Sequence, residues 1–437
     1  MKNPCSSGRR FPSWPDRRGT ALVLVLWVMV VLSAVALPLA FSSRLRLQVT
    51  ASVGHGTQAL YLAKAGVERV LADLGEGRES IQMLDDLRES ELNPLHNVEL
   101  GPGTYTLFAG YESNGDPSYG LIDECAKINV GTADQAVLAK LPGMSDTLAS
   151  ELVAQRGRTP FNDLNDLLLL ERMSTELLFG EDANGNGVLD GNENDGSASW
   201  PQDNADGRLD PGLSAYLTAW SSSRNVTSTG GERVNINSAS ANDITKSVSG
   251  VSKEQAESIV EHRKKKKFAN IVELLDVKIV KKVTQKSEDK NKSSDNKENT
   301  VTQTTDKNAF DENAFRKIAD AVTTTDDKVR RGVVNLNTAS EEVLACLPGI
   351  SKTLAASIRQ AREKREDGFQ SVADLLDVEG VSTEILKQLC SHVSVRSDVF
   401  SLWSYGVTRS GNIYRCVHAV VDRTESVSRI RYWRELE

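Results

Sequence analysis

The apolar run TALVLVLWVMVVLSAVALPLAF (20–41) contains no charged side chain and directly follows the short basic stretch 17–19. As a helix rising about 1.5 Å per residue it would extend roughly 33 Å, enough to cross a bilayer. A cleaved secretory signal would have a shorter apolar core and a small-residue cleavage site, and neither is clear here. Arginines precede the run at positions 9, 10, 17 and 18. Because basic flanks stay cytoplasmic, we expect a single-pass protein whose bulk lies on the external side.

The helical pattern continues beyond the membrane segment. Apolar residues recur at helical spacing between Leu60 and Leu71, while charged residues fall on the other faces. This pattern is typical of an amphipathic helix that covers a globular head. Residues 103–112 (GTYTLFAGYE) and 119–130 (YGLIDECAKINV) predict strands separated by a turn.

The C-terminal segment 396–437 alternates between apolar and polar residues around two turn-like breaks, as in a three-stranded antiparallel meander. Strands at both ends of the external part, with helical patterns between them, indicate an α+β fold. We expect one antiparallel sheet built from 42–127 and 396–437, with a large inserted all-α domain at 128–395.

The insertion contains an internal repeat, near 128–175, 234–278 and 334–395. Counted from a turn glycine (Gly143, Gly250, Gly349), each copy has alanine at six, an aliphatic residue at nine and arginine at thirteen. Such matching offsets are a specific signal of repeated units. Each copy predicts a helix, a glycine turn and a second helix with a serine N-cap.

The copies resemble helix-hairpin-helix (SAM-like) modules, some of which bind DNA through a glycine–hydrophobic–glycine hairpin. Here serine replaces the second glycine in every copy, and the 437-residue chain has a net charge of −8. Both features argue against nucleic acid as a partner and favour a structural role. If phosphate does bind, the basic cluster Arg263–Lys267 is the expected place, the alternative being a solvated face.

A calcium site is predicted at 181–213. The loop DANGNGVLDGNE (182–193) matches the EF-hand pattern of oxygen donors around a glycine at the sixth position. Its expected ligands are Asp182, Asn184, Asn186, the carbonyl of Val188, Asp190 and Glu193. A second acidic cluster, Asp203, Asp206 and Asp210, resembles a degraded loop, so we expect one or two Ca²⁺ ions. The competing interpretation is a plain Asn/Asp/Gly loop.

Three further features of the sequence concern disorder, disulfides and catalysis. Residues 281–312 are polar, charged and poor in large apolar groups, so we expect them to be disordered. Cys346 and Cys390 bracket the third repeat and could form a disulfide, or both could remain free. No nucleophile–histidine grouping is recognisable, so we expect no enzymatic activity.

The order of these features resembles the minor pseudopilin K family of type II secretion (GspK-like). The matching pieces are RRGTALVLVLWVMVVLSAVA (17–36), LYLAKAGVERVL (60–71), GLIDECAKINVGTA (120–133), VNLNTAS (334–340) and YWREL (432–436). The resemblance implies a leader at 1–19 that prepilin peptidase cuts between Gly19 and Thr20, followed by methylation of the new amine. It also implies an inner-membrane anchor, a calcium-binding periplasmic head, and assembly with other minor pseudopilins and the pseudopilus, with possible contacts to secreted proteins.

Leu24 occupies the fifth position after that cleavage site, where filament-building pilins carry glutamate. Their carboxylate neutralises the N-terminal amine of the subunit ahead, because a charge in lipid is costly without a partner. A subunit at the tip has no subunit ahead, so leucine fits a tip subunit that initiates or caps the pseudopilus. The alternative is a membrane-anchored, ComEA-like DNA receptor, which would also combine one span with hairpin modules.

Overall fold

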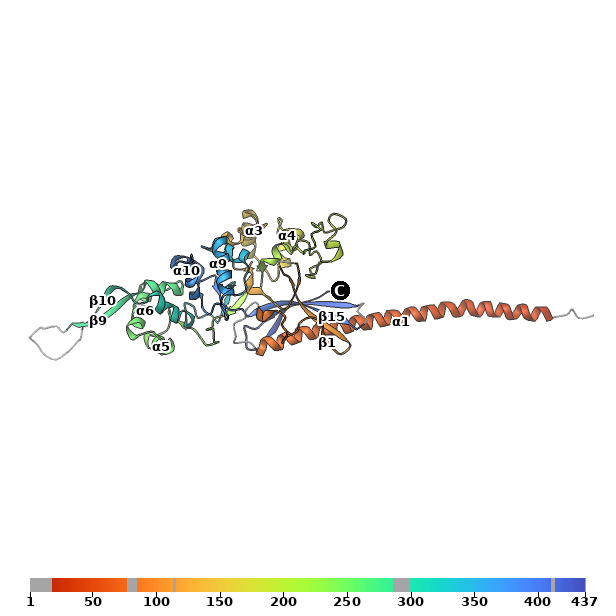
Figure 1. The fold of residues 1–437 in the computed structure, drawn as a ribbon, viewed down its shortest axis with the longest axis horizontal. Coiled ribbons are helices and arrows are strands. Elements are labelled where there is room, and N and C mark those ends of the chain that lie inside the picture. The colour runs from red at the N-terminus through yellow and green to blue at the C-terminus, as the bar shows by residue number, and fades with distance from the viewer. Residues whose placement is uncertain (1–17, 77–84, 113–114, 286–298, 410–412, 437) are drawn as a thin grey trace, which may run out of the picture. The chain divides into compact units, whose positions relative to one another are not determined.

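A computed structural model describes residues 18–76, 85–112, 115–285, 299–409 and 413–436. The chain divides into an N-terminal part, Met1–Gln58, and a globular part, Ala59–Glu437 (Figure 1). Most of the expected leader lies outside the described residues. Its last two positions, Arg18 and Gly19, begin the long helix α1.

Helix α1 (Arg18–Glu76) contains the apolar run. Among the described residues it is the one helix long and apolar enough to cross a membrane, judged by length and composition. Large apolar side chains from Leu22 to Phe41 are exposed along it, as expected for residues that contact lipid. Pro38 lies inside the helix.

The sheet of the globular part is formed by both ends of the chain, as predicted. Its order is β1-β2-β15-β16-β17, with β3 paired to β2 and β4 to β15, and all of these pairs are antiparallel. The strands are β1 (Val98–Leu100), β2 (Gly103–Tyr111), β3 (Pro117–Tyr119), β4 (Ile122–Asp123), β15 (Val399–Thr408), β16 (Tyr414–Asp422) and β17 (Arg429–Leu436). The predicted C-terminal meander is therefore present. The strand expected at 119–130 is instead divided among β3, β4, the turn η2 (Glu124–Ala126) and β5 (Ile128–Asn129).

One face of this sheet packs against the last turns of α1, and two glycines permit the close approach. A Cβ atom at Gly406 would lie 2.0 Å from the Ala59 carbonyl oxygen, and one at Gly66 would lie 2.3 Å from the Ser404 hydroxyl. The resulting core contains side chains from the helix and from central strands, with Ala63, Val67, Leu107, Phe400, Leu402, Val417 and Ala419 almost fully buried. The short helix η1 (Asp85–Leu87) contributes Leu87 to it.

The insertion between β4 and β15 contains three copies of one unit, here called repeats 1, 2 and 3. Repeat 1 comprises β5, α2 (Gln135–Leu138), α3 (Asp146–Arg156), η3 (Leu164–Leu169), α4 (Thr175–Phe179) and β6 (Leu217–Thr218). Repeat 2 comprises β8 (Val234–Asn235), α5 (Ala241–Ser247), α6 (Lys253–Lys265), η6 (Ile271–Asp276), α7 (Glu312–Ile318), η7 (Ala319–Ala321) and β11 (Val322–Thr323). Repeat 3 comprises β13 (Val334–Asn335), α8 (Glu341–Cys346), α9 (Lys352–Glu363), η8 (Val372–Asp377), α10 (Thr383–Leu389) and β14 (Val393–Ser394).

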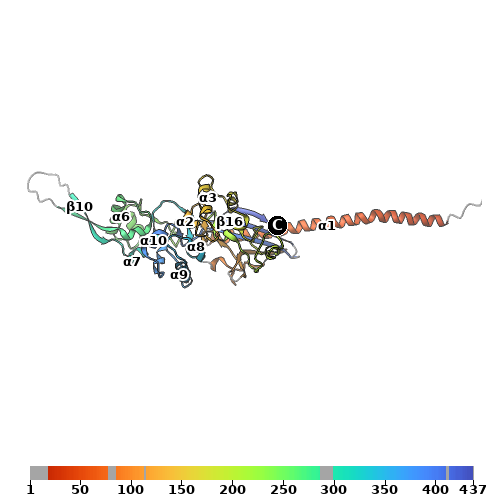
Figure 2. The ribbon, with the colours of Figure 1, turned by 90° about the horizontal axis from the view of Figure 1, so that it is seen from above.

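Each repeat closes on itself through a two-residue parallel pairing of its first and last strands: β5 with β6, β8 with β11, and β13 with β14. A further pair, β7 (Ser222–Arg224) with β12 (Val329–Arg331), is antiparallel. The α+β fold class is thus confirmed, although the insertion also contains these short strands. One continuous apolar core runs through all the repeats, and repeat 3 lies between repeats 1 and 2 (Figures 1 and 2).

The long excursions are insertions into this repeat pattern. In repeat 1 the predicted calcium loop, with η4 (Gly191–Glu193) and η5 (Gly212–Ala215), separates α4 from β6. In repeat 2 the antiparallel strands β9 (Lys278–Gln285) and β10 (Asn299–Asn308) separate η6 from α7. The expectation of disorder throughout 281–312 was therefore wrong for these strands, whose β-branched residues favour extended backbone. Residues 286–298 lie outside the described residues.

The serine caps and the repeated arginine explain why the copies fold alike. Ser145, Ser252 and Ser351 cap α3, α6 and α9, each accepting a hydrogen bond from a backbone amide three residues ahead. The repeated arginines (Arg156, Arg263 and Arg362) each direct Nη1 to two backbone carbonyl oxygens near the start of the same repeat. These contacts, buried in repeat 3 and partly buried in repeats 1 and 2, hold the second helix of each hairpin against the start of its repeat.

Candidate metal centre

The predicted calcium loop folds around the carboxylate of Asp182. Its Oδ1 accepts a hydrogen bond from the backbone amide of Asn186 at 3.0 Å, and its Oδ2 accepts one from Gly187 at 2.9 Å. Gly187 has a φ of 77°, which a residue with a side chain adopts only with strain. The sharp turn expected at the sixth loop position is therefore present.

The far end of the loop is tied back to its start by Glu193, which is only 1 % exposed. Its two carboxylate oxygens accept hydrogen bonds from the backbone amides of Ala183 and Asp190, each at 3.1 Å. Burial raises the pKa of Glu193, and the nearby charges of Asp182 and Asp190 raise it further. Burial likewise raises the pKa of Asp182. A divalent cation would offset this repulsion between partly desolvated carboxylates.

The asparagines of the loop are close to Asp190 but present their amide nitrogens to it. Nδ2 of Asn184 and Nδ2 of Asn186 donate to Oδ2 of Asp190, at 2.7 and 2.9 Å. To bind a cation, each amide would rotate about its terminal torsion, which has a broad, roughly two-fold potential. Within the described residues, no group of three or more His, Cys, Asp or Glu side chains is already arranged as a metal site. The loop thus has a suitable backbone and donor set, with the side chains in a different hydrogen-bonded arrangement.

The second acidic cluster is organised differently. Both oxygens of Asp203 accept hydrogen bonds from backbone amides, those of Asp195, Gly196 and Ala205. Asp206 and Asp210 each accept one from the amide two residues ahead. The contacts therefore place these carboxylates on separate turns.

Glu181 was missed by the sequence analysis. It is 8 % exposed and accepts hydrogen bonds from the amides of Asn204 and Asp210, which ties the second cluster to the start of the first loop. The available signal was its position immediately before the loop.

The loop docks on the sheet face opposite α1. The Tyr405 hydroxyl donates to the Asn186 carbonyl at 2.7 Å, and the Tyr111 hydroxyl accepts from the Leu189 amide at 2.9 Å. Beside these contacts lies a cavity of about 600 Å³. It is lined by Trp403 and His418, whose rings stack with centroids 4.8 Å apart. Burial lowers the pKa of His418 to about 4.

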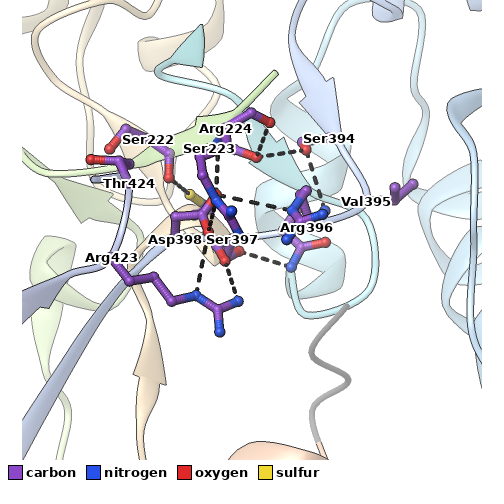
Figure 3. A network of polar contacts seen from close by, with 12 residues as sticks. Ser222, Ser223, Arg224, Ser394, Val395, Arg396, Ser397, Asp398, Arg423 and Thr424 are labelled. Atoms are coloured by element: carbon purple, nitrogen blue, oxygen red, sulfur yellow. Dashed lines mark hydrogen bonds and ion pairs between the residues drawn. The ribbon is translucent and has the colours of Figure 1, made fainter. Parts of the chain in front are cut away.

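Behind the cavity, a buried polar cluster joins the insertion to the sheet (Figure 3). Asp398, at the start of β15, accepts a hydrogen bond from Arg224 Nε at 3.1 Å and lies within ion-pair distance of Arg396 and Arg423. Asp123, at the start of the insertion, accepts from the side chains of Ser397 and Asn335, at 2.6 and 2.9 Å. These contacts connect the point where the chain leaves the sheet after β4 with the point where it returns at β15.

The predicted processing-site residues and the basic cluster lie outside the calcium loop. Gly19, Thr20 and Leu24 lie in the first turns of α1, and Leu24 is 65 % exposed. Arg263 uses Nη1 for the carbonyls of Ile236 and Ala239, at 2.8 and 2.7 Å. The expected phosphate-binding arginine is therefore engaged in its own repeat, which leaves the exposed lysines 264–267 as a solvated face.

The disulfide considered between Cys346 and Cys390 is absent, and both thiols are free and buried. Cys346 donates to the Glu342 carbonyl at 3.2 Å and lies near Lys140 of repeat 1. Cys390 lies near Ile271 and Arg330 on the side of repeat 2. The two thiols therefore point to opposite neighbours of repeat 3.

Comparison with protein families supports the repeats. A family model described as "Helix-hairpin-helix motif" matches residues 123–178, 230–288 and 329–394, which confirms the predicted repeats. The chain is therefore an α+β protein that carries three helix-hairpin-helix motifs. It is similar to a chain in the crystal structure of the GspK-GspI-GspJ complex from the enterotoxigenic Escherichia coli type 2 secretion system. That similarity covers 90% of this chain and 99% of the other, with 14% identity and a TM-score of 0.36.

Curated relatives match a much shorter region. Endonuclease/exonuclease/phosphatase family domain-containing protein 1 of Mus musculus, Rattus norvegicus and Homo sapiens is 38% identical to the chain over 82 residues. The match covers 19% of this chain and 14% of each relative. The chain thus spans about a seventh of the length of these relatives.

Proposed function

We propose that this protein is a minor pseudopilin of a type II secretion system, a non-enzymatic subunit that initiates or caps the pseudopilus at its tip. The observation that carries the proposal is the construction of the sheet. Strands from both ends of the external chain pair as β2 with β15, and the last turns of α1 cover one face. The helix-hairpin-helix repeats are inserted between β4 and β15. This is the architecture that the sequence resemblance implied.

The tip position is supported by Leu24. In the proposed mature chain it stands fifth, where a shaft subunit would need a carboxylate to neutralise a neighbouring amine. Because an unpaired charge in the membrane is unfavourable, leucine suits a subunit with none ahead of it. The bulky insertion would also exclude the subunit from a regular shaft.

As a pseudopilin, this protein would have a defined location, processing step and set of partners. Helix α1 anchors the precursor in the inner membrane, prepilin peptidase cuts before Thr20, the new amine is methylated, and the globular part lies in the periplasm. The GspK chain of the similar structure is in a complex with GspI and GspJ, so we propose corresponding minor pseudopilins as partners. Contacts with secreted proteins fit the same position.

Two measurements test the proposal. N-terminal sequencing of the membrane-extracted protein should give a methylated Thr20, whereas an intact Met1 would contradict processing. Gold-labelled antibody against the globular part should mark one end of isolated pseudopili. Labelling along the whole filament would rule out the tip role while leaving a pseudopilin possible.

We also propose that the loop 182–193 binds Ca²⁺ through Asp182, Asn184, Asn186, the Val188 carbonyl, Asp190 and Glu193. The buried carboxylates at the two ends of the loop support this, and such hard oxygen donors are those that Ca²⁺ prefers. A bound ion would supply charge neutralisation and rigidity rather than chemistry. Asp203, Asp206 and Asp210 make their backbone contacts on separate turns rather than around one centre, so we propose one ion.

The helix-hairpin-helix matches favour one second candidate, a membrane-anchored, ComEA-like DNA receptor. Against it stand the serine in each hairpin and the engagement of Arg263 with backbone carbonyls. A gel-shift titration of duplex DNA with the detergent-solubilised full chain distinguishes the candidates. The pseudopilin proposal predicts no shift at moderate salt, and a salt-sensitive shift lost on replacing lysines 264–267 would favour the receptor.

A further inference from the structure

A small polar cavity of about 210 Å³ lies between repeats 2 and 3. One wall comes from η6 and from the segment after β11, and the other comes from η8 and the end of α10. Its volume is below the roughly 300–1,000 Å³ typical of drug-sized ligands. The cavity therefore suits an ion or a compact polar group.

Arg330 projects into this cavity from β12. Its Nη2 donates to the carbonyl oxygens of Cys390 and Ser391, each at 3.2 Å. Among the described residues, no carboxylate lies within ion-pair distance of it. Burial lowers the pKa of Arg330, and the neighbouring charge of Arg233 lowers it further. A partly buried cation with carbonyl contacts but no counter-ion is less favourable than one that an anion reaches.

The other cation of the cavity is already neutralised. Arg233 pairs with Asp320, with Nη2 2.9 Å from Oδ1, and its Nε donates to the Asp320 carbonyl, also at 2.9 Å. The two arginines and one aspartate leave a net positive charge in the wall. That charge lies at Arg330.

A buried acceptor completes the cavity. Asn225 is 9 % exposed, and its Nδ2 donates to the Thr323 hydroxyl and to the Asp327 carbonyl, both at 3.0 Å. This fixes the amide orientation and leaves Oδ1 without a hydrogen-bond partner among the described residues, at a residue that lines the cavity. An occupant that satisfies both groups needs a negative oxygen for Arg330 and a hydrogen-bond donor for Asn225.

We propose that this cavity binds a phosphate-type oxyanion, one that carries both charged and protonated oxygens and so joins repeats 2 and 3. A hydrogen phosphate ion or a phosphomonoester can accept from the Arg330 guanidinium and donate a P–OH hydrogen bond to Asn225. Guanidinium–phosphate contacts are among the stronger charge-assisted hydrogen bonds. Sulfate has the same shape but, at neutral pH, no proton for Asn225. The proposal does not depend on the pseudopilin assignment.

The test is isothermal titration of the detergent-solubilised full chain with inorganic phosphate, sulfate and chloride, below the concentration at which calcium phosphate precipitates. We expect phosphate to bind more tightly than sulfate and chloride not to bind. A titration with glycerol phosphate separates the two sources of the ligand. Binding of the ester assigns a phosphomonoester, and binding of phosphate alone assigns the free ion.

Two variants change the two polar groups of the site separately. Arg330→Gln removes the cation, and Asn225→Asp places a repelling charge on an isosteric side chain; each should weaken phosphate binding by at least about tenfold. Arg359→Gln is the matched control, because that arginine lies in repeat 3 but pairs with Glu341 and Glu363 at the surface.

Folding of each variant is checked by circular dichroism, and Arg330→Met provides a second test. Without phosphate this variant should melt no lower than wild type, because it removes a partly buried charge that has no carboxylate partner. Added phosphate should then raise the Tm of wild type only. The proposal is overturned if phosphate gives neither heat nor a Tm shift in wild type. It is also overturned if chloride binds as tightly as phosphate, or if Arg359→Gln weakens phosphate binding as much as Arg330→Gln does.

Discussion

The carboxylate of Asp398 lies 3.3 Å from the guanidinium Nε of Arg423, and neither side chain has any exposed surface. Asp398 begins the strand by which the chain returns from the insertion, and Arg423 follows the next strand of the sheet. The Arg423 guanidinium also donates to the Ser397 carbonyl at 2.9 Å. This buried pair therefore ties the point where the chain returns from the insertion to the end of β16.

We predict that Asp398→Asn destabilises the protein by about 3–5 kcal/mol, because it leaves several buried arginines without their shared counter-charge. Chemical denaturation followed by tryptophan fluorescence measures the loss. The control is Glu425→Gln, which removes the 2.8 Å ion pair between Glu425 and Arg429. Both side chains of that pair are more than half exposed. That exposed pair should contribute less than about 1 kcal/mol. Equal losses for the two variants would contradict the role given to Asp398.

A second prediction concerns pH. Burial lowers the pKa of His418 from 6.5 to about 4, and its charged neighbours are Glu124, Lys127 and Arg434. Between these values the unfolded chain binds a proton that the folded chain excludes, so stability falls as pH decreases from 6.5 to 4. The full loss from this group is about 3 kcal/mol.

His418→Phe should remove this contribution while keeping a ring between Trp403 and Tyr432. The carboxylates of Asp182 and Glu193, with raised pKa values, act in the opposite direction. The measurement is therefore the difference in unfolding free energy between wild type and variant, taken from pH 7 to pH 4. A difference that does not change with pH would show that His418 titrates normally.

A third prediction uses the repeated arginine. Arg362 is 7 % exposed, and its Nη1 donates to the Leu336 and Ala339 carbonyls at 3.1 and 2.6 Å. Arg362→Met keeps most of the apolar stem but leaves those buried acceptors unpaired, so we expect a loss of about 1–3 kcal/mol. Arg359→Met, one turn earlier on the same helix, removes only partly exposed ion pairs with Glu341 and Glu363 and should cost less than Arg362→Met in the same melt. The reverse order would disprove the structural role of the repeated arginine.

The sequence predicted the repeats well because their determinants are local. Glycine turns, serine caps and one arginine recur at fixed offsets, and each acts within its own unit. A sheet shared by both ends of the chain was also predicted from their alternating patterns, although the pairing of β2 with β15 was not. The β9–β10 hairpin was missed because polar composition outweighed the β-branched pattern of Val280, Val283 and Val301.

The remaining features depend on contacts between distant segments. Asp398 with its arginines, and Arg330 with Asn225, are each brought together only when repeats dock on each other and on the sheet. No spacing in the sequence marks such residues. Glu193, by contrast, could be assigned to the last loop position from the sequence because the loop is continuous. The orientation of the asparagine amides toward Asp190 depends on a side-chain rotation that composition does not determine.

A fourth prediction tests the metal proposal. Calcium should raise the Tm of the full chain, and Glu193→Gln should weaken calcium binding by at least about tenfold, because it removes a buried charged ligand. Titration calorimetry after chelator treatment measures both effects. Asp134→Asn is the control, since Asp134 is exposed and its side chain makes no cap hydrogen bond. A calcium response that survives in Glu193→Gln would place the ion elsewhere.

The last prediction concerns the thiols. Because Cys125, Cys346, Cys390 and Cys416 are free and buried, a denatured, unreduced sample should react with iodoacetamide at all four positions. The native sample should react far more slowly, since burial raises the pKa of Cys346 to about 11 and that of Cys416 to about 12, and the thiolate is the reactive form. Peptide mass spectrometry identifies the modified sites. If Cys346 and Cys390 stayed unmodified until a reductant was added, they would be disulfide-bonded in the cell, and repeat 3 would have to pack differently against both of its neighbours.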